Sequence, residues 1–412
     1  MAARTNLPGT LILAFGLAVA SAGRCAADGT DPALIAKGAG LAAIGNCASC
    51  HTAEGGRAFA GGRALATPFG TIYSTNITPD RDTGIGSWSE ADFRRAMHEG
   101  VAPGQRELYP AFPYDHFTRV SDDDVHAIHA YLMTREPVRA SAPRNALRFP
   151  MNVRPAIALW KLAFFRPGPY RPDPSRDAAW NRGAYLADGL AHCGACHTPR
   201  NGLGAEERDR DLAGGEAEGW HASALDASSP APRRWTADEL YAYLRTGRDA
   251  RHGIAAGPMA DVTHNLAQAP ASDVRAIAVY IASRLPDSPA PPPQPLRDAR
   301  AASSEGAAIF AGACSGCHGA VPQSFSAASI PLAVTTSLNA PDPRNVIHIV
   351  MEGLRPQPGE KGEWMPAFAA ELTDAQLAAL VDYLRAQYTG RPAWRDVEAH
   401  IAAIRRSLKD ES

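Results

Sequence analysis

The sequence has few cysteines for its length and no marked excess of charge of either sign. Seven cysteines among 412 residues are too few for a fold held together by disulfide bonds. The formal net charge of −2 gives no indication of a nucleic-acid-binding surface. Beyond the N-terminus there is no apolar run long enough to span a bilayer, which excludes a multi-span membrane protein. The length predicts two to three domains.

The N-terminal residues 1–22 have the pattern of a secretory signal peptide. A basic residue, Arg4, precedes the apolar run Leu11–Ala20, and Ala20-Ser21-Ala22 is a small-x-small cleavage pattern. We expect cleavage after residue 22, or as late as residue 27, and export of the mature chain to the periplasm. Cys25 lies close to the cleavage region and is interpreted as incidental.

The six remaining cysteines form three copies of one motif, C-x-x-C-H. The copies are Cys47, Cys50 and His51; Cys193, Cys196 and His197; and Cys314, Cys317 and His318. This spacing is the attachment signal for haem c, in which both thiols form thioethers and the histidine is an axial ligand of the iron. A zinc site would need two cysteine pairs that converge, whereas these pairs lie in separate parts of the chain. A redox dithiol would not require the histidine three times.

Each haem motif lies inside a larger repeat. An opening helix begins around Gly38, Gly183 and Gly306, and a glycine there would let this helix cross closely over another. A closing helix in each copy carries apolar residues at i, i+3, i+6 and i+7. These are Val125, Ile128, Tyr131 and Leu132; Val274, Ile277, Tyr280 and Ile281; and Leu377, Leu380, Tyr383 and Leu384. The repeat predicts a mostly α fold of three tandem class I cytochrome c domains.

Proline-rich stretches predict the domain boundaries. The expected domains are 28–136, 177–285 and 300–390, which we call the first, second and third units. The expected linkers are 137–176 and the proline-rich 286–299, and 391–412 is a C-terminal tail. Within the first linker, the apolar segment 157–165 is expected either to pack between units or to dock a partner or a membrane.

Methionines are the expected second axial ligands in two of the units. Met259 follows Gly257-Pro258, and Met365 lies between Trp364 and Pro366. Both positions precede a closing helix and have loop character. Ligation by histidine and methionine raises the haem potential and leaves no open position for a substrate.

The first unit departs from this pattern because Phe112 occupies the equivalent position and cannot ligate iron. His116 follows on the same loop and is one candidate for the sixth ligand. Met97 is another, although its alignment with Leu244 and Val350 indicates the apolar face of a helix. An open or water-bound iron is the third possibility.

Longer segments resemble a known family. The stretch Thr67–Asp80 (TPFGTIYSTNITPD), followed by Ile85-Gly86 and Trp88, resembles the triple-haem cytochrome c subunits of bacterial membrane-bound alcohol, aldehyde and gluconate dehydrogenases. The likeness extends through Leu108–Met133 and Leu212–Gly215 over nearly the whole mature chain. The variant with Phe112 is more similar to subunits that accompany molybdenum hydroxylases such as nicotinate, isoquinoline or aldehyde dehydrogenases.

The resemblance implies three covalently bound haem c groups and a role in electron transfer. The implied partner is a catalytic dehydrogenase subunit, with molybdopterin and iron–sulfur clusters favoured and PQQ or flavin as alternatives. The implied acceptor is ubiquinone or a terminal oxidase, with peripheral membrane association at the periplasmic face of the inner membrane. No acid/base pair or nucleophile in the sequence indicates substrate chemistry on this chain. Two alternative functions are a peroxidase-like haem enzyme with an open iron in the first unit, and a free-standing multihaem shuttle.

Overall fold

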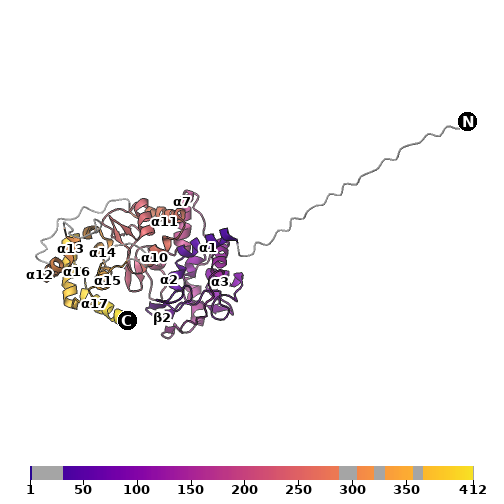
Figure 1. Cartoon of the computed structure of the whole chain (residues 1–412), viewed down its shortest axis with the longest axis horizontal. Coiled ribbons are helices and arrows are strands. Elements are labelled where there is room, and N and C mark those ends of the chain that lie inside the picture. Colours follow the sequence, from indigo (N-terminus) through magenta and orange to yellow (C-terminus); the bar gives the residue numbers. More distant parts are fainter. Residues whose placement is uncertain (2–30, 287–303, 320–329, 356–364, 412) are drawn as a thin grey trace.

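A computed structural model describes residue 1 and residues 31–286, 304–319, 330–355 and 365–411. The predicted signal peptide, Cys25 and nearly all of the proline-rich stretch 286–299 lie outside the described residues. The described part is mostly helical with a few short strands, as predicted (Figure 1). Within that part, no helix combines the length and the apolar character needed to cross a membrane.

The first unit and the segment after it contain a small sheet among short helices. Its elements are α1 (Pro32–Ile44), α2 (Cys47–Cys50), β1 (Ala64–Thr67), β2 (Gly70–Tyr73), α3 (Glu90–Glu99), β3 (Val101–Ala102), β4 (Arg106–Glu107), α4 (Tyr114–Phe117), α5 (Asp122–Met133), β5 (Ala146–Leu147) and α6 (Pro155–Phe164).

The second unit repeats the plan of the first. Its elements are α7 (Ala178–Tyr185), the π-helical turn η1 (Leu186–Leu190), α8 (Gly194–His197), the 3₁₀ turn η2 (Arg208–Arg210), β6 (Gly215–Ala217), β7 (Trp220–Ala222), α9 (Ala237–Thr246), β8 (Arg248–Asp249), β9 (Gly253–Ile254), α10 (Pro258–Leu266) and α11 (Ala271–Arg284).

The third unit keeps the helices and, within its described residues, has a single isolated bridge in place of a sheet. Its elements are α12 (Ser304–Ile309), the π-helical turn η4 (Phe310–Cys314), α13 (Ser315–His318), the 3₁₀ turn η5 (Leu332–Val334), α14 (Thr336–Asn339), α15 (Arg344–Glu352), α16 (Asp374–Thr389) and α17 (Val397–Glu411).

The predicted crossing of opening and closing helices is present in all three units. A Cβ atom added at Gly38 would lie 1.9 Å from the carbonyl oxygen of Ala127 on α5. At Gly183 the corresponding distance, to the oxygen of Ala276 on α11, is 2.0 Å, and at Gly306, to Ala379 on α16, it is 2.2 Å. Glycine is therefore required at each crossing because any side chain would collide with the facing backbone.

Local capping residues explain where the helices begin. The predicted cap Ser121 accepts a hydrogen bond from the backbone of Asp124 at the start of α5. Thr373 forms a reciprocal capping box with Gln376 at the start of α16. The helices before the predicted ligand loops, α3 and α9, also have capping boxes, at Ser89 and Thr236. These pairs satisfy backbone N–H groups that have no partner inside the helix.

The hydrophobic core is not divided into three. One core runs through the first and second units and includes Leu41, Ile128, Leu190 and Ile277. A second core lies in the third unit, around Met351 and its neighbours, and it includes Ile401 of α17. The first two units are thus packed as one body, and the segment 391–412, expected as a tail, contributes to the third core.

The segment 137–176 is attached to the first unit rather than extended as a spacer. Strand β5 pairs antiparallel with β2, so that the sheet order is β1-β2-β5. The amide of Asn76 donates to the carbonyl oxygen of Val138 at 2.7 Å. These bonds give the expected linker a fixed place on the surface of the first unit.

Candidate haem sites

The three haem motifs lie on short helices directly after the opening helices. Helix α2 carries Cys47 and Cys50, whereas α8 and α13 carry the second cysteine and the histidine of their motifs, with Cys193 and Cys314 directly before them. In the second and third units a π-helical turn joins the two helices, a deviation that often marks functional positions. The residue before the first cysteine has a positive φ in two units, 52° at Asn46 and 40° at His192. The turn brings both cysteines and the histidine onto one compact segment.

The histidines of the first two motifs are held in the tautomer that a metal ligand needs. The Nδ1 atom of His51 lies 2.6 Å from the carbonyl oxygen of Thr75, and Nδ1 of His197 lies 2.6 Å from that of Ser223. A carbonyl only accepts, so Nδ1 carries the proton and the Nε2 lone pair is left for a metal. Burial lowers the pKa of both histidines, and the carbonyl bond opposes this only in part. Both imidazoles are therefore neutral near pH 7.

Cys47, Cys193 and Cys196 are half-buried and hold their protons. Burial raises the pKa of Cys47 and Cys193 to about 12 and that of Cys196 to about 11. Zinc binding and disulfide exchange require thiolates, so these environments fit neither. Among the described residues, the clusters of three side chains able to bind a metal ion contain no cysteine. Apolar surroundings of this kind suit neutral thioether sulfurs.

A single cavity of about 930 Å³ connects the second and third motifs. Its lining includes Cys193, Cys196 and His197 from the second unit and Cys314, Cys317 and His318 from the third, and Cys50 of the first unit also lies on its wall. This volume is near the upper limit for a small-molecule pocket. The remaining wall is largely apolar, as expected for a site that encloses large aromatic groups.

Both methionines predicted as ligands line this cavity. Met259 lies in the first turn of α10, directly after Pro258, and not in a loop as the sequence suggested. Met365 forms a short antiparallel bridge with Leu354, with both N–H···O distances 2.9 Å. Each methionine thus shares the cavity with the histidine of its own motif. The residues present fit a haem c with histidine and methionine axial ligands.

In the first unit, Phe112 packs at the edge of the core. Its ring meets that of Phe117 edge-on, with the ring centroids 5.2 Å apart. Met97 is buried in the shared core on α3. The residues aligned with it, Leu244 and Val350, both line the cavity of the other two units. The face of α3 that carries Met97 therefore corresponds to a cavity-facing surface.

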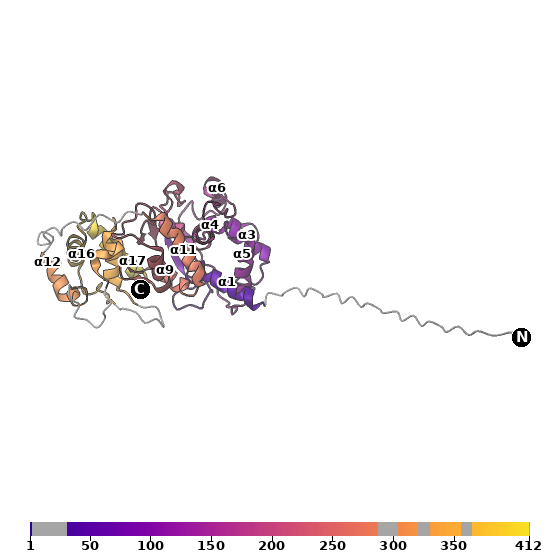
Figure 2. The ribbon, with the colours of Figure 1, turned by 90° about the horizontal axis from the view of Figure 1, so that it is seen from above.

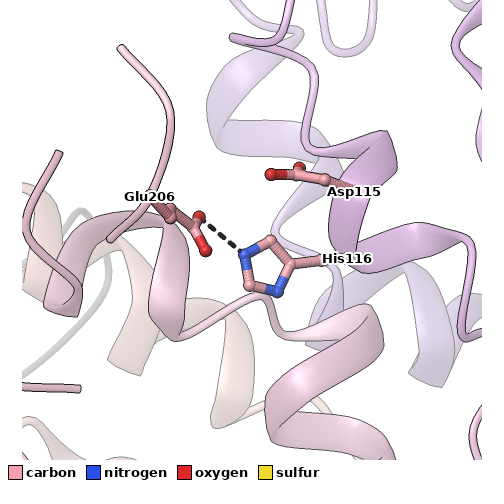
Figure 3. Close-up of side chains that lie close together, drawn as sticks. All are labelled: Asp115, His116 and Glu206. Carbon is pink, nitrogen blue, oxygen red and sulfur yellow. Dashed lines mark hydrogen bonds and ion pairs between the residues drawn. The ribbon is translucent and has the colours of Figure 1, made fainter. Parts of the chain in front are cut away.

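His116 lies at the junction of the first two units, with its ring beside Gly194 of the second motif. Its Nδ1 donates to the carbonyl oxygen of Asp188 at 2.9 Å. Its Nε2 donates to the carboxylate of Glu206 at 2.8 Å, as Figure 3 shows. Both nitrogens face acceptors, and burial is outweighed by Glu206 and Asp115, so the pKa of His116 is raised. With both ring nitrogens engaged in hydrogen bonds, neither is free to bind iron. The predicted role of His116 as sixth ligand is therefore disfavoured.

Polar contacts between the first two units lie beside the motifs, and no sequence pattern indicated them. The side-chain amide of Asn265 donates to Ser49 at 2.8 Å and also contacts Asn46. Arg63 donates to the carbonyl oxygen of Ser49 at 2.9 Å and pairs with Glu218 at 2.8 Å. These residues hold the Cys50 end of the first motif against the second unit.

The third unit is joined to the second by a separate set of contacts. The ring of Trp220 stacks on His348, with centroids 4.4 Å apart and planes inclined by 17°. Asn345 exchanges two hydrogen bonds with the backbone of His221, at 2.9 and 2.8 Å. Arg344 pairs with Glu216 at 2.6 Å. Together these contacts close one side of the shared cavity.

Comparison with known proteins agrees with this geometry. Residues 35–136 match the family model "Cytochrome c", and residues 301–384 match that of "Cytochrome C oxidase, cbb3-type, subunit III". The gluconate 2-dehydrogenase cytochrome c subunit of Pantoea cypripedii is 38% identical over 429 residues, which cover 97% of this chain and 95% of that protein. The fructose dehydrogenase cytochrome subunit of Gluconobacter japonicus is 34% identical, over 89% of this chain and 81% of the relative.

Another relative is longer than this chain. A subunit of the nicotinate dehydrogenase of Pseudomonas putida is 48% identical over 380 residues, which cover 90% of this chain and 32% of that protein. The chain thus spans about a third of this relative's length. From the motifs, the cavity and these relatives we conclude that the chain belongs to the cytochrome c subunits of dehydrogenases and carries electrons on covalently bound haem c.

Proposed function

We propose that the chain holds three haem c groups and passes electrons from a catalytic dehydrogenase subunit to membrane ubiquinone or a terminal acceptor. The observation that carries this proposal is the single cavity shared by the second and third motifs, with Cys50 of the first motif on its wall. Electron carriers exchange electrons efficiently only when they lie close together. The shared cavity and the common core of the first two units provide that proximity.

The cysteine pairs of the three motifs would form the thioethers, and His51, His197 and His318 would be the proximal ligands. Met259 and Met365 would complete the second and third sites. The count of three is supported by the three motifs and by the similar glycine crossing beside each of them. Haem c with these ligands exchanges single electrons and leaves no position for a substrate. The surrounding chain excludes water and fixes the proximal histidine tautomer through Thr75 and Ser223.

Met97 is our proposed sixth ligand in the first unit. Support comes from its aligned residues, Leu244 and Val350, which face the cavity of the other units. It also comes from His116, both of whose ring nitrogens are engaged by Asp188 and Glu206. An open iron in the first unit is the alternative, and it would permit the peroxidase-like chemistry considered above.

The proposed partner is a dehydrogenase subunit with molybdopterin and iron–sulfur clusters, located in the periplasm with this chain. Support comes from the Phe112 variant and from 48% identity to a subunit of a nicotinate dehydrogenase. PQQ and flavin partners remain alternatives because gluconate, fructose and alcohol dehydrogenase subunits are also relatives.

The proposal is tested on the complex purified from its native host. A haem assay should give three haems per chain, and adding the dehydrogenase's substrate under anaerobic conditions should reduce them. Turnover of the catalytic subunit with the haems still oxidised would refute the proposed function. A chain that purifies without any stoichiometric subunit would instead support a free-standing shuttle. A purely low-spin, six-coordinate ferric spectrum would exclude the open-iron alternative.

A further inference from the structure

The large apolar side chains that are most exposed gather in one region of the molecule. Phe149 is 81% exposed, Leu159 71% and Leu162 80%, and with Val153 and Leu203 they form what we call the apolar patch. In the described part of the chain, the other exposed large apolar residues are the terminal Met1 and Met133, and Met133 is only 36% exposed. Exposed apolar groups that gather in this way usually mark an interaction surface.

The exposure of the patch follows from how α6 is fixed to the first unit. Ile157 is buried beneath the helix. The ammonium group of Lys161 donates to the carbonyl oxygens of Glu99 at 2.7 Å and of Gly100 at 2.8 Å. With this face anchored, Leu159 and Leu162, which are three positions apart and share a face, point outward. Figure 2 shows α6 at the outer edge of the molecule.

The loop that carries Leu203 is tied to the same helix. The indole N–H of Trp160 donates to the carbonyl oxygen of Leu203 at 2.9 Å. The side chain of Leu203, which is 51% exposed, thereby becomes part of the surface formed by α6. The patch is thus built from two segments that hydrogen bonds hold in place.

The patch lies in a strongly basic segment of the chain. Residues 137–172 contain seven basic residues and no aspartate or glutamate, although the whole chain has a net charge of −2. The basic residues are Arg139, Arg144, Arg148, Arg154, Lys161, Arg166 and Arg171. Arg148 and Arg166 are exposed and lie at the two ends of the stretch that carries Phe149, Leu159 and Leu162.

This combination matches the chemistry of an anionic membrane surface. A short helix with one apolar face inserts that face into the boundary between headgroups and acyl chains, and flanking arginines reach lipid phosphates. The charged residues of 137–172 are all basic, which matches a surface that is uniformly anionic, such as a leaflet containing anionic phospholipids. Protruding side chains at the outer edge of the molecule also suit insertion into a bilayer better than docking into a partner's pocket.

We propose that α6 and the apolar patch dock this chain on the surface of a bilayer containing anionic phospholipids. The inference rests on the proposed delivery of electrons to a membrane acceptor and extends it, since it names the surface that would face the membrane. Leu159 and Leu162 insert among the lipids, and Arg148 and Arg166 contact the phosphates. Lys161 and Ile157 keep the helix in place and remain on the protein side.

The test uses the full haem-loaded chain and sedimentation with phospholipid vesicles. We expect binding to vesicles of phosphatidylethanolamine with phosphatidylglycerol, and weaker binding to phosphatidylcholine alone. The double substitution Leu159→Glu and Leu162→Glu should lower the affinity at least about tenfold, because two leucines are lost from the lipid interface. The matched control, Met133→Glu, changes an exposed apolar residue outside the patch and should bind as the wild type does.

Charge is tested separately, by Arg148→Glu with Arg166→Glu. This variant should lose the preference for phosphatidylglycerol and become insensitive to salt. Each variant should keep the wild-type haem spectrum, which shows that the fold is intact.

Two results would overturn the inference. One is a wild-type chain that does not bind the anionic vesicles, and the other is a leucine variant that binds them as well as the wild type does. If that variant also no longer purifies with the catalytic subunit, the patch is a protein interface. Vesicle binding involves no electron transfer, and reduction of the haems by the partner can be measured in detergent solution. Failure of this inference is therefore distinguishable from failure of the proposed function.

Discussion

The close crossing of α12 and α16 makes Gly306 a sensitive position for stability. In Gly306→Ala the new Cβ would lie 2.2 Å from the carbonyl oxygen of Ala379 and 2.8 Å from Cβ of Tyr383. The two helices must separate by about 1 Å to restore ordinary van der Waals distances. Both neighbouring atoms are backbone or Cβ atoms, so no flexible side chain can move aside.

The cost of this separation can be worked out approximately. Overpacking a core usually costs about 1–3 kcal/mol, and the rigid backbone facing Gly306 places this substitution in the upper half, at about 2–3 kcal/mol. The better helix propensity of alanine returns about 1 kcal/mol. The net destabilisation is then about 1–2 kcal/mol. In a domain of this size each kcal/mol corresponds to roughly 4–8 °C, so we expect a fall in melting temperature of about 4–16 °C for the third unit.

Calorimetry of the full chain, combined with hydrogen–deuterium exchange, measures this effect. Faster exchange should be confined to the third unit because it has its own core. The matched control is Gly316→Ala, since a Cβ there meets nothing within 4 Å and the other units have Ser49 and Ala195 at that motif position. If Gly306→Ala melts at the same temperature as Gly316→Ala, the close crossing is not what requires glycine.

Three further predictions concern single side chains. Met259→Leu should lower the potential of one haem and convert it to a high-spin form in redox titration and EPR, whereas Met351→Leu, buried in the third core, should not. Met97→Leu should change the EPR signal of the first haem and His116→Gln should not; the opposite result would assign the ligand to His116. Glu206→Gln should destabilise the first two units by about 3–5 kcal/mol in urea unfolding, because a buried cation loses its charged partner. The pKa of His116 is raised from its usual 6.5, so the pair's contribution is complete below pH 6.5 and is lost as pH rises through the folded value. This explanation would be contradicted if the free energy of unfolding of the wild type did not change between about pH 6 and 9. It would also be contradicted if Glu206→Gln kept the pH dependence of the wild type.

The repeat could be predicted from the sequence because its signals are local. The two cysteines and the histidine of each motif lie within about one helical turn, so their spacing alone specifies the chemistry. The apolar stripe that begins at Val125, and its two copies, indicate the buried face of a closing helix. Gly38 and its equivalents indicate where the opening helix crosses that closing helix. The position of Met259 before a closing helix is a local signal of the same kind, and this residue lines the cavity, although it lies in a helix rather than in the expected loop.

The junctions between units could not be predicted. His116 is hydrogen bonded to Glu206, 90 residues away in the sequence, and Asn265 is hydrogen bonded to Ser49, 216 residues away. A periodic pattern in the sequence cannot identify polar partners that are so far apart. The sequence likewise marked Phe112 as unusual without showing that the neighbouring His116 is directed to the second unit.

The haem chemistry and the threefold repeat can be read from the amino-acid order alone, since covalent attachment and helix amphipathicity depend on residues a few positions apart. The folded chain was needed to show that the first two units share one core and that the second and third motifs open into one cavity. It was also needed to show which apolar side chains of 149–162 remain exposed. Those properties depend on how distant surfaces pack against each other, and each is set by contacts whose partners are far apart in the chain.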